Sequence, residues 1–472
     1  MLSSLNNRAA IDGKRGEGLQ GAGERNTQSH YGYVIVGSAF VIAAVIVGTV
    51  FTFGVFLDPL LADFGWGRGV LSGAWSLCFI LSGFLGILAG RLSDRFGPRR
   101  VVLICNLFLG LGFAMMSRVH AIWQVYLFYG GLVAIGMSAS IAPLQSTVVR
   151  WFPRRRGVML GIFLMGLTSG VMIVPLVANW LIGMVAWRTA YLALGIGSFL
   201  VISLAALFLK RGGVAKDELA CTADCVERRG GNLEKMNELS FREAFRTSQF
   251  WLISAFFFFQ CFAMMIIMTH IVSHAINVGI ASTTAVAILA VIGGISSVMV
   301  IPEGFLADRI GIRKTAIIIT SVLVVAMAWL PVTGQKIWSL LLFAVMFGVA
   351  FGGLDVLLSL ITSRIFGLIA LGAIIGFVNF ALQVGGAMGP FIAGIMFDLT
   401  GSYQTAFLTG AGAAVIALMI ALFIRPFGEN ADCYERMTRK KESVTNGMKC
   451  SGELEKREGL PFDEYRSGVA VL

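Results

Sequence analysis

The sequence predicts an all-α integral membrane protein with twelve transmembrane helices in two pseudo-symmetric six-helix bundles, and three observations predict it. The chain has 472 residues, of which 57% are hydrophobic and 13% charged, whereas a soluble domain carries about 25% charged residues. Its apolar residues form long continuous runs, which exclude a membrane β-barrel because barrel strands alternate polar and apolar residues. The second half of the chain also repeats motifs of the first half.

Twelve apolar runs predict the helices one by one. Each run is long enough to cross a hydrocarbon core of ~30 Å at a helical rise of ~1.5 Å per residue. No secretory signal precedes the first run, so we expect that run to be the insertion signal. The runs span, in order, residues 33–57, 68–90, 100–117, 121–147, 157–180, 187–209, 249–275, 282–306, 314–332, 337–362, 369–397 and 402–424.

The basic residues predict the orientation of these helices. The formal net charge is +11, and 33 of the 37 Lys and Arg residues lie in segments that face one side of a twelve-span bundle. Only Arg68, Arg118, Arg188 and Lys336 fall on the other side. Cytoplasmic segments carry such an excess, so both termini are predicted to lie in the cytoplasm. The basic charge is therefore a topology signal and does not indicate a nucleic-acid partner.

This topology divides the chain into five segments. Two six-helix bundles, residues 33–209 and 249–425, are joined by a cytoplasmic linker of mixed charge at 210–248. Polar tails occupy residues 1–32 and 426–472. We expect the linker and both tails to be solvated and to carry no chemistry of their own.

The cysteines predict neither disulfides nor a metal site. Three of the seven lie in apolar runs, where cysteine packs as a small hydrophobic residue, and the other four lie in segments predicted to be cytoplasmic. Cys221 and Cys225 have the spacing of a metal pair, but no histidine stands near them. We expect no cofactor and no metal.

The repeat is clearest in two loops. The segment GRLSDRFGPRR at residues 90–100 returns as GFLADRIGIRK at 304–314, an offset of 214. Arg150 returns as Arg364 at the same offset. A duplication of this kind places a binding site between the two halves near the bilayer midplane, with access that alternates between the two sides.

The two loops resemble the signature loop of the major facilitator superfamily, and the resemblance covers about residues 33–425. It implies the fold of that superfamily and a gate that holds the cytoplasmic side shut in the outward-facing state. The gate residues would be Gly90, Asp94, Arg95, Gly97, Arg99, Gly304, Asp308, Arg309, Gly311 and Arg313. Independently of the resemblance, Gly97 and Gly311 permit tight turns, and Asp94 and Asp308 can pair with arginine or accept bonds from a helix N-terminus.

Within the superfamily the chain resembles the monocarboxylate and oxalate–formate transporter-like branch. The resemblance rests on WFPRRRG at 151–157, GGAMGP at 385–390 and FDLTGSY at 397–403. Two positions depart from that branch. Val300 stands where those transporters often have an arginine, and residues 33–57 contain no lysine or arginine. A bound carboxylate would therefore be held by histidine, hydroxyl groups, amides or helix N-termini.

One carboxyl group lies deep in the predicted membrane. Asp355 stands about nine residues before Arg364, and charge at such depth usually faces a cavity or a partner. It can carry a coupling proton, bind a cationic group, or remain neutral in a hydrogen bond to a neighbouring helix.

Other polar side chains complete the candidate pathway. His270 shares one helix face with His274, near the end of its span opposite the cytoplasm, and can bind an anion or titrate near neutral pH. Each of the others either lines the cavity or joins two helices. They are Thr52, Gln145, Gln260, Asn379 and Gln383. Glu303 is expected to join the gate charges.

These features predict a secondary active transporter of a small organic solute, of carboxylate type and coupled to protons, in the plasma membrane and active as a monomer. One alternative is an antiporter that exports amphipathic cations. Another is a sensor that uses a transporter fold without transport. No phosphate-binding loop of the kind that couples to ATP occurs in the chain, and no cluster of catalytic residues is evident, so no enzymatic activity is predicted.

Overall fold

The computed structural model describes residues 31–152, 156–210, 241–366 and 371–424, and within them twelve helices are long and apolar enough to cross a membrane. The predicted all-α fold with twelve spans is confirmed. The chain separates into the units Met1–Ile424 and Arg425–Leu472. The predicted tails 1–32 and 426–472 and the linker 210–248 lie wholly or mostly outside the described residues.

The spans follow one another in chain order. The first is Tyr31–Phe64, whose last part is α2 (Phe53–Phe64). The other helices of the first half are α3 (Arg68–Phe96), α4 (Pro98–Met116), α5 (Ile122–Val125), η1 (Tyr126–Val133), α6 (Ala134–Met137), α7 (Ala142–Trp151), α8 (Arg156–Met184) and α9 (Trp187–Leu207).

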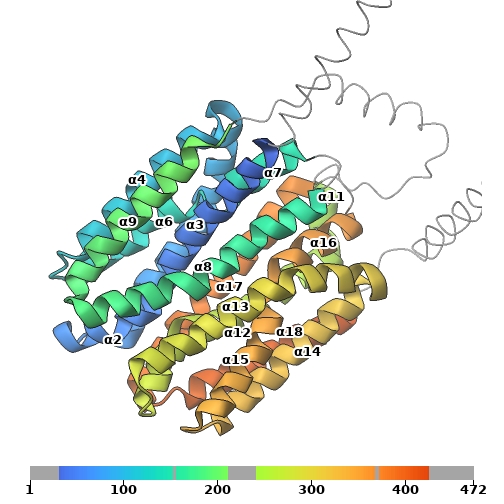
Figure 1. The fold of residues 1–472 in the computed structure, drawn as a ribbon. Helices are drawn as coiled ribbons and strands as arrows, with labels where there is room; N and C mark the ends of the chain where they lie inside the picture. The colour runs from blue at the N-terminus through green and yellow to red at the C-terminus, as the bar shows by residue number, and fades with distance from the viewer. Residues whose placement is uncertain (1–30, 153–155, 211–240, 367–370, 425–472) are drawn as a thin grey trace, which may run out of the picture. The chain divides into compact units, whose positions relative to one another are not determined.

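The second half has the same plan. It comprises α12 (Ser248–Asn277), α13 (Ser282–Ile310), α14 (Ile312–Trp329), η2 (Leu330–Val332), α15 (Ile337–Gly352), α16 (Leu354–Phe366), α17 (Leu371–Thr400) and α18 (Gln404–Phe423). The short helix α11 (Phe241–Phe245) stands before α12, inside the segment predicted to be a linker. Figure 1 shows the long helices running side by side.

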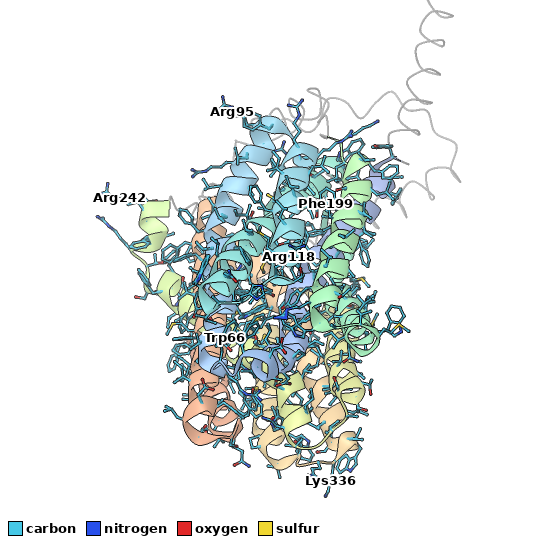
Figure 2. All side chains as sticks on the ribbon, turned by 90° about the vertical axis from the view of Figure 1, so that its left-hand side faces the viewer. Trp66, Arg95, Arg118, Phe199, Arg242 and Lys336 are labelled. Carbon is cyan, nitrogen blue, oxygen red and sulfur yellow. The ribbon has the colours of Figure 1, made fainter. Side chains whose placement is uncertain are left out.

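The helices have two chemically different ends. The end that carries Arg95, Arg150, Arg309 and Arg313 is called the basic end, and the opposite end, with Lys336, is called the far end. Figure 2 shows Arg95 and Lys336 at opposite ends of the helices. At the basic end, Gly97 and Gly311 both have φ +90°, a backbone conformation that favours glycine, and each ends one long helix and begins the next. The tight turns predicted at these glycines are thus present.

Two long helix pairs at the boundary between the halves are copies of each other. In the first seam α3 packs along α17, and in the second α13 packs along α8 (Figure 1). In the first seam Phe79 fills the space beside Gly386, where an added Cβ would lie 2.7 Å from the Phe79 ring. The residue equivalent to Phe79 in the second seam is Gly293, and its Cβ would lie 2.5 Å from the backbone nitrogen of Met172. Glycine therefore meets a side chain in the first seam and a helix backbone in the second.

Spans 4 and 10 are interrupted, which the continuous apolar runs did not predict. In span 4 a π-helical stretch, η1, is followed by a break at residues 138–141 before α7 begins. In span 10, α15 ends at Gly352 and α16 begins at Leu354. The two breaks correspond under the 214-residue offset of the repeat. Interrupted spans at equivalent positions of the two halves are the typical location of a transporter's binding site.

Candidate functional site

The far ends of the two halves are joined by a polar network centred on Arg68, at the first residue of α3. The backbone N–H groups of Arg68 and Gly69 donate to the carboxylate of Asp398, on α17, over 2.9 and 2.7 Å. The Arg68 guanidinium forms an ion pair with Asp58 at 3.3 Å and lies over the Phe397 ring at 4.2 Å. Asp58 lies inside the first span, which extends to Phe64 rather than ending near residue 57 as predicted. A carboxylate from one half therefore caps a helix of the other half.

Tyr403 connects this network to His270. An Arg68 N–H donates to the Tyr403 hydroxyl oxygen over 2.6 Å, and that hydroxyl lies 3.3 Å from His270 Nδ1. His270 Nε2 lies 3.0 Å from the carbonyl oxygen of Pro390, which can only accept, so Nε2 carries the proton and Nδ1 accepts from Tyr403. Burial raises the pKa of the Tyr403 phenol above its usual range although the Arg68 guanidinium opposes this, so the phenol keeps its proton. His270 is fully buried, with both ring nitrogens occupied.

In this conformation His270 takes part in the closure of the far end, where its bonds link α12 to α17 and, through Ser72 at 3.4 Å, to α3. His274, one turn on, packs edge-on against Phe407 with ring centroids 4.8 Å apart. The predicted role of His270 in the solute pathway stays a prediction.

Three of the predicted polar residues lie near the two helix breaks or on a seam. Asp355 stands in the first turn of α16, directly after the break in span 10, and is half-buried. Gln145 stands in the first turns of α7, after the break in span 4, and is also half-buried. Gln383, on α17, is buried at the first seam and packs over Gly83 of α3, where a Cβ would lie 2.9 Å from Gln383 Cγ. A solute site formed by these residues stays a prediction.

Two other predicted residues face their own half. The Gln260 side chain is fully buried and its Oε1 accepts from the Thr320 hydroxyl of α14 over 3.0 Å. The Thr52 hydroxyl donates to the Thr49 carbonyl oxygen over 2.6 Å, where the first span changes to α2. These are contacts between or within helices of one half. Asn379, four residues before Gln383 on α17, is half-buried.

Three gate residues of the basic end make described contacts within their own halves. Asp94 pairs with Arg150 at the end of α7 over 2.5 Å. In the other half Arg313 donates to the carbonyl oxygen of Leu422 over 2.5 Å. Arg309 stacks on Phe305 of its own helix. Gly90 lies against α7, where a Cβ would meet Ala142, whereas Gly304 faces Val356 of α16. Among the described residues, the hydrogen bonds between the halves lie at the far end and along the seams, so this structure is closed at the far end.

Glu303 has no part in a charge network. It is 2% exposed, and neither carboxyl oxygen has a hydrogen-bond partner among the described residues. A Cβ on Gly353 would lie 2.2 Å from Glu303 Oε2, so the carboxyl group rests on the junction between α15 and α16. We expected Glu303 among the gate charges, and the structure instead buries it against span 10.

The sequence did not predict the far-end network. Arg68 was expected only as one of four basic residues on the side opposite the cytoplasm, and Asp398 and Tyr403 only as parts of the motif FDLTGSY. The available signal was their charge: Asp398 and Arg68 are ionisable residues placed at the ends of two spans from different halves. Within the described ranges no three His, Cys, Asp or Glu side chains gather in a way that could hold a metal ion.

Comparisons with known proteins support these observations. The family model described as Major Facilitator Superfamily matches residues 39–367 and 295–446. Monocarboxylate transporter 13 of Rattus norvegicus is 27% identical over 436 residues, which cover 91% of this chain and 97% of that protein. Monocarboxylate transporter 4 of Rattus norvegicus is 24% identical, over 92% of this chain and 90% of that protein.

Solved structures share the fold at lower identity. A D-xylose-proton symporter superposes with a TM-score of 0.65 at 15% identity, over 84% of this chain and 98% of that chain. A bacterial homologue of the human lysosomal transporter Spinster, in an inward-facing and occupied conformation, superposes with a TM-score of 0.62 at 14% identity, over 84% of this chain and 96% of that chain.

Proposed function

From the premise that this chain belongs to the Major Facilitator Superfamily and is a transporter related to the monocarboxylate transporters, we propose that it moves a small carboxylate together with a proton by alternating access. The observation that carries the proposal is the pair of matched breaks in spans 4 and 10, with Asp355 in the first turn after one break. Its relationship to monocarboxylate transporters 13 and 4 supports a monocarboxylate as solute.

The carboxylate would bind between the halves, close to the two breaks. Gln145, Gln383 and Asn379 would offer amide groups, and the N-terminal turn of α7 would offer backbone N–H groups and a partial positive charge. Asp355 would take up the proton, so that solute and proton cross together without net charge. Val300, at 2% exposure, provides no cation at the position where the branch has arginine. The amides and the helix end would therefore replace an ion pair.

Rocking of residues 33–209 against 249–425 would expose the site to each side in turn. The basic end would be cytoplasmic in the plasma membrane, following the excess of basic residues there. The Arg68–Asp398 network would open when the site faces outward, and the loops of Asp94 and Asp308 would then close the cytoplasmic side. We propose that one copy of the chain is sufficient for transport.

Transport by purified protein in liposomes loaded with a pH dye tests this function. Lactate, pyruvate, acetate, formate and oxalate are added singly, followed by lipophilic cations, with protein-free liposomes to subtract leak. We expect one of the carboxylates to acidify the interior, and Asp355→Asn to abolish the acidification because the side chain can no longer release a proton. Alkalinisation of acid-loaded vesicles by cations would instead support an antiporter, for which a mid-membrane carboxylate without a basic residue would be the binding group. No response to any solute would favour the sensor.

A further inference from the structure

Glu303 is a buried ionisable residue that has no hydrogen-bond partner for its side chain among the described residues. Its side chain is 2% exposed and both carboxyl oxygens lack hydrogen-bond partners. An ionised carboxylate without a partner costs several kcal/mol in a low-dielectric interior. In this arrangement the group is therefore held as the neutral acid, with a proton on one oxygen.

The Glu303 carboxyl group lies at the junction between two helices of span 10. Gly353, against which it rests, is the residue between α15 and α16. The neighbouring Gly352 contacts the Ser296 backbone of α13, where a Cβ would lie 2.6 Å from the carbonyl oxygen. Both contacts need glycine, so α13 and span 10 touch closely at the break. A movement of α16 relative to α13 would change the surroundings of Glu303 directly.

Among the residues that the structure describes, no charged group forms a hydrogen bond with the Glu303 carboxyl group. On its own helix, Val300 precedes it by one turn, and Asp308 and Arg309 follow toward the basic end. On α14, whose Ile319 lies beside Gly353, Arg313 and Lys314 stand in the first turn at the basic end. On α16, Asp355 follows two residues after Gly353. None of these side chains forms a described hydrogen bond or ion pair with Glu303.

We propose that Glu303 is a proton-binding site of the transport cycle, in addition to Asp355. While the carboxyl group packs against Gly353, its O–H bond remains and the acid keeps its proton. When the α15–α16 junction moves away, water from the basic end reaches the carboxyl group, the O–H bond breaks, and the proton leaves to that water. The electron pair stays on the carboxylate, which is reprotonated from the far side after the molecule reorients. The inference rests on proton coupling in the proposed function.

The first experiment measures the proton on Glu303 without any transported solute. The infrared spectrum of purified protein is recorded across a pH titration, and the band of protonated carboxyl groups is compared between wild type and Glu303→Gln. We expect the variant to lose one component of that band. Glu243→Gln, an exposed glutamate of α11, is the matched control and should leave the band unchanged. An identical band in wild type and Glu303→Gln would overturn the proposal.

The second experiment separates proton coupling from solute movement. Glutamine mimics the protonated acid, so Glu303→Gln should still exchange labelled lactate for unlabelled lactate but should lose accumulation driven by a pH gradient. Gly353→Ala displaces the carboxyl group and should also lose accumulation. Accumulation at the wild-type level in both variants would overturn the proposal. If wild type moves no lactate or other carboxylate, the proposed function fails, while the infrared band still decides whether Glu303 binds a proton.

Discussion

The far-end network makes a quantitative prediction for Asp398→Asn. In the structure one carboxylate accepts from two consecutive N–H groups at the start of α3, over 2.9 and 2.7 Å. An asparagine keeps one acceptor oxygen but turns an amide NH₂ toward the second donor, and it removes the negative charge from the helix N-terminus. A hydrogen bond to a charged group contributes about 1.5–3 kcal/mol, and exposure to water reduces that value. We therefore expect a loss of about 1–2 kcal/mol, because Asp398 is exposed.

That loss acts on the balance between two conformations. The bond joins the halves only when the far end is closed, so its removal leaves the open state unaffected. Since 1.4 kcal/mol corresponds to a factor of ten, the ratio of closed to open far ends should fall by roughly 5- to 30-fold. Spin labels can be attached at His120 and Gln335, which are exposed residues of different halves at that end. In pulsed electron paramagnetic resonance the closed and open far ends give two different distances between the labels, and the populations of these distances give the ratio.

A matched control comes from the same end of the molecule. Asp63 pairs with Arg188 at 3.4 Å, and both residues belong to the first half. Asp63→Asn should therefore leave the distribution of label separations unchanged. The reasoning is refuted if Asp398→Asn gives the wild-type distribution, or if Asp63→Asn opens the far end to the same extent.

Two further predictions concern contacts inside the bundle. Gly293→Ala places a Cβ within 2.5 Å of the Met172 backbone, so it should open the second seam and reduce uptake. The control is Gly294→Ala, whose Cβ would lie 3.0 Å from the sulfur of the flexible Met172 side chain, and this variant should retain uptake. Equal uptake by the two variants would contradict the backbone clash. Gln260→Leu should leave the KM for solute unchanged, because the Gln260 amide oxygen accepts from the Thr320 hydroxyl of the same half. An increase in KM would place Gln260 in the solute site after all.

The sequence predicted the spans because a bilayer imposes an apolar composition along each of them, and it predicted the duplication because a loop motif returns at a fixed offset. It did not predict the breaks in spans 4 and 10, since Gly352 and Gly353 lie within an apolar run and differ little from glycines inside intact helices. Tertiary contacts with Ser296 and Glu303, which no local pattern encodes, determine the conformation there.

The candidate site was only partly predictable for a related reason. A polar residue in an apolar helix shows that a partner exists, but it does not show whether that partner is a solute or another helix. Asp355 and Gln145 lie beside the breaks, whereas Gln260 bonds to Thr320 and His270 to Pro390. Polar residues at similar depth therefore have different partners, because they occupy different faces of their helices in the assembled bundle.

The contacts of the two seams also bear on the ancestry of the molecule. In the first seam the Phe79 ring lies against Gly386, whereas Gly293, the residue equivalent to Phe79, lies against the Met172 backbone in the second seam. An assembly of two first halves would therefore place the Phe79 ring against an α8 backbone that leaves no room even for a Cβ at Gly293. A homodimeric ancestor could have used identical seams, but we expect that the first half of the present chain can no longer form such a seam with itself.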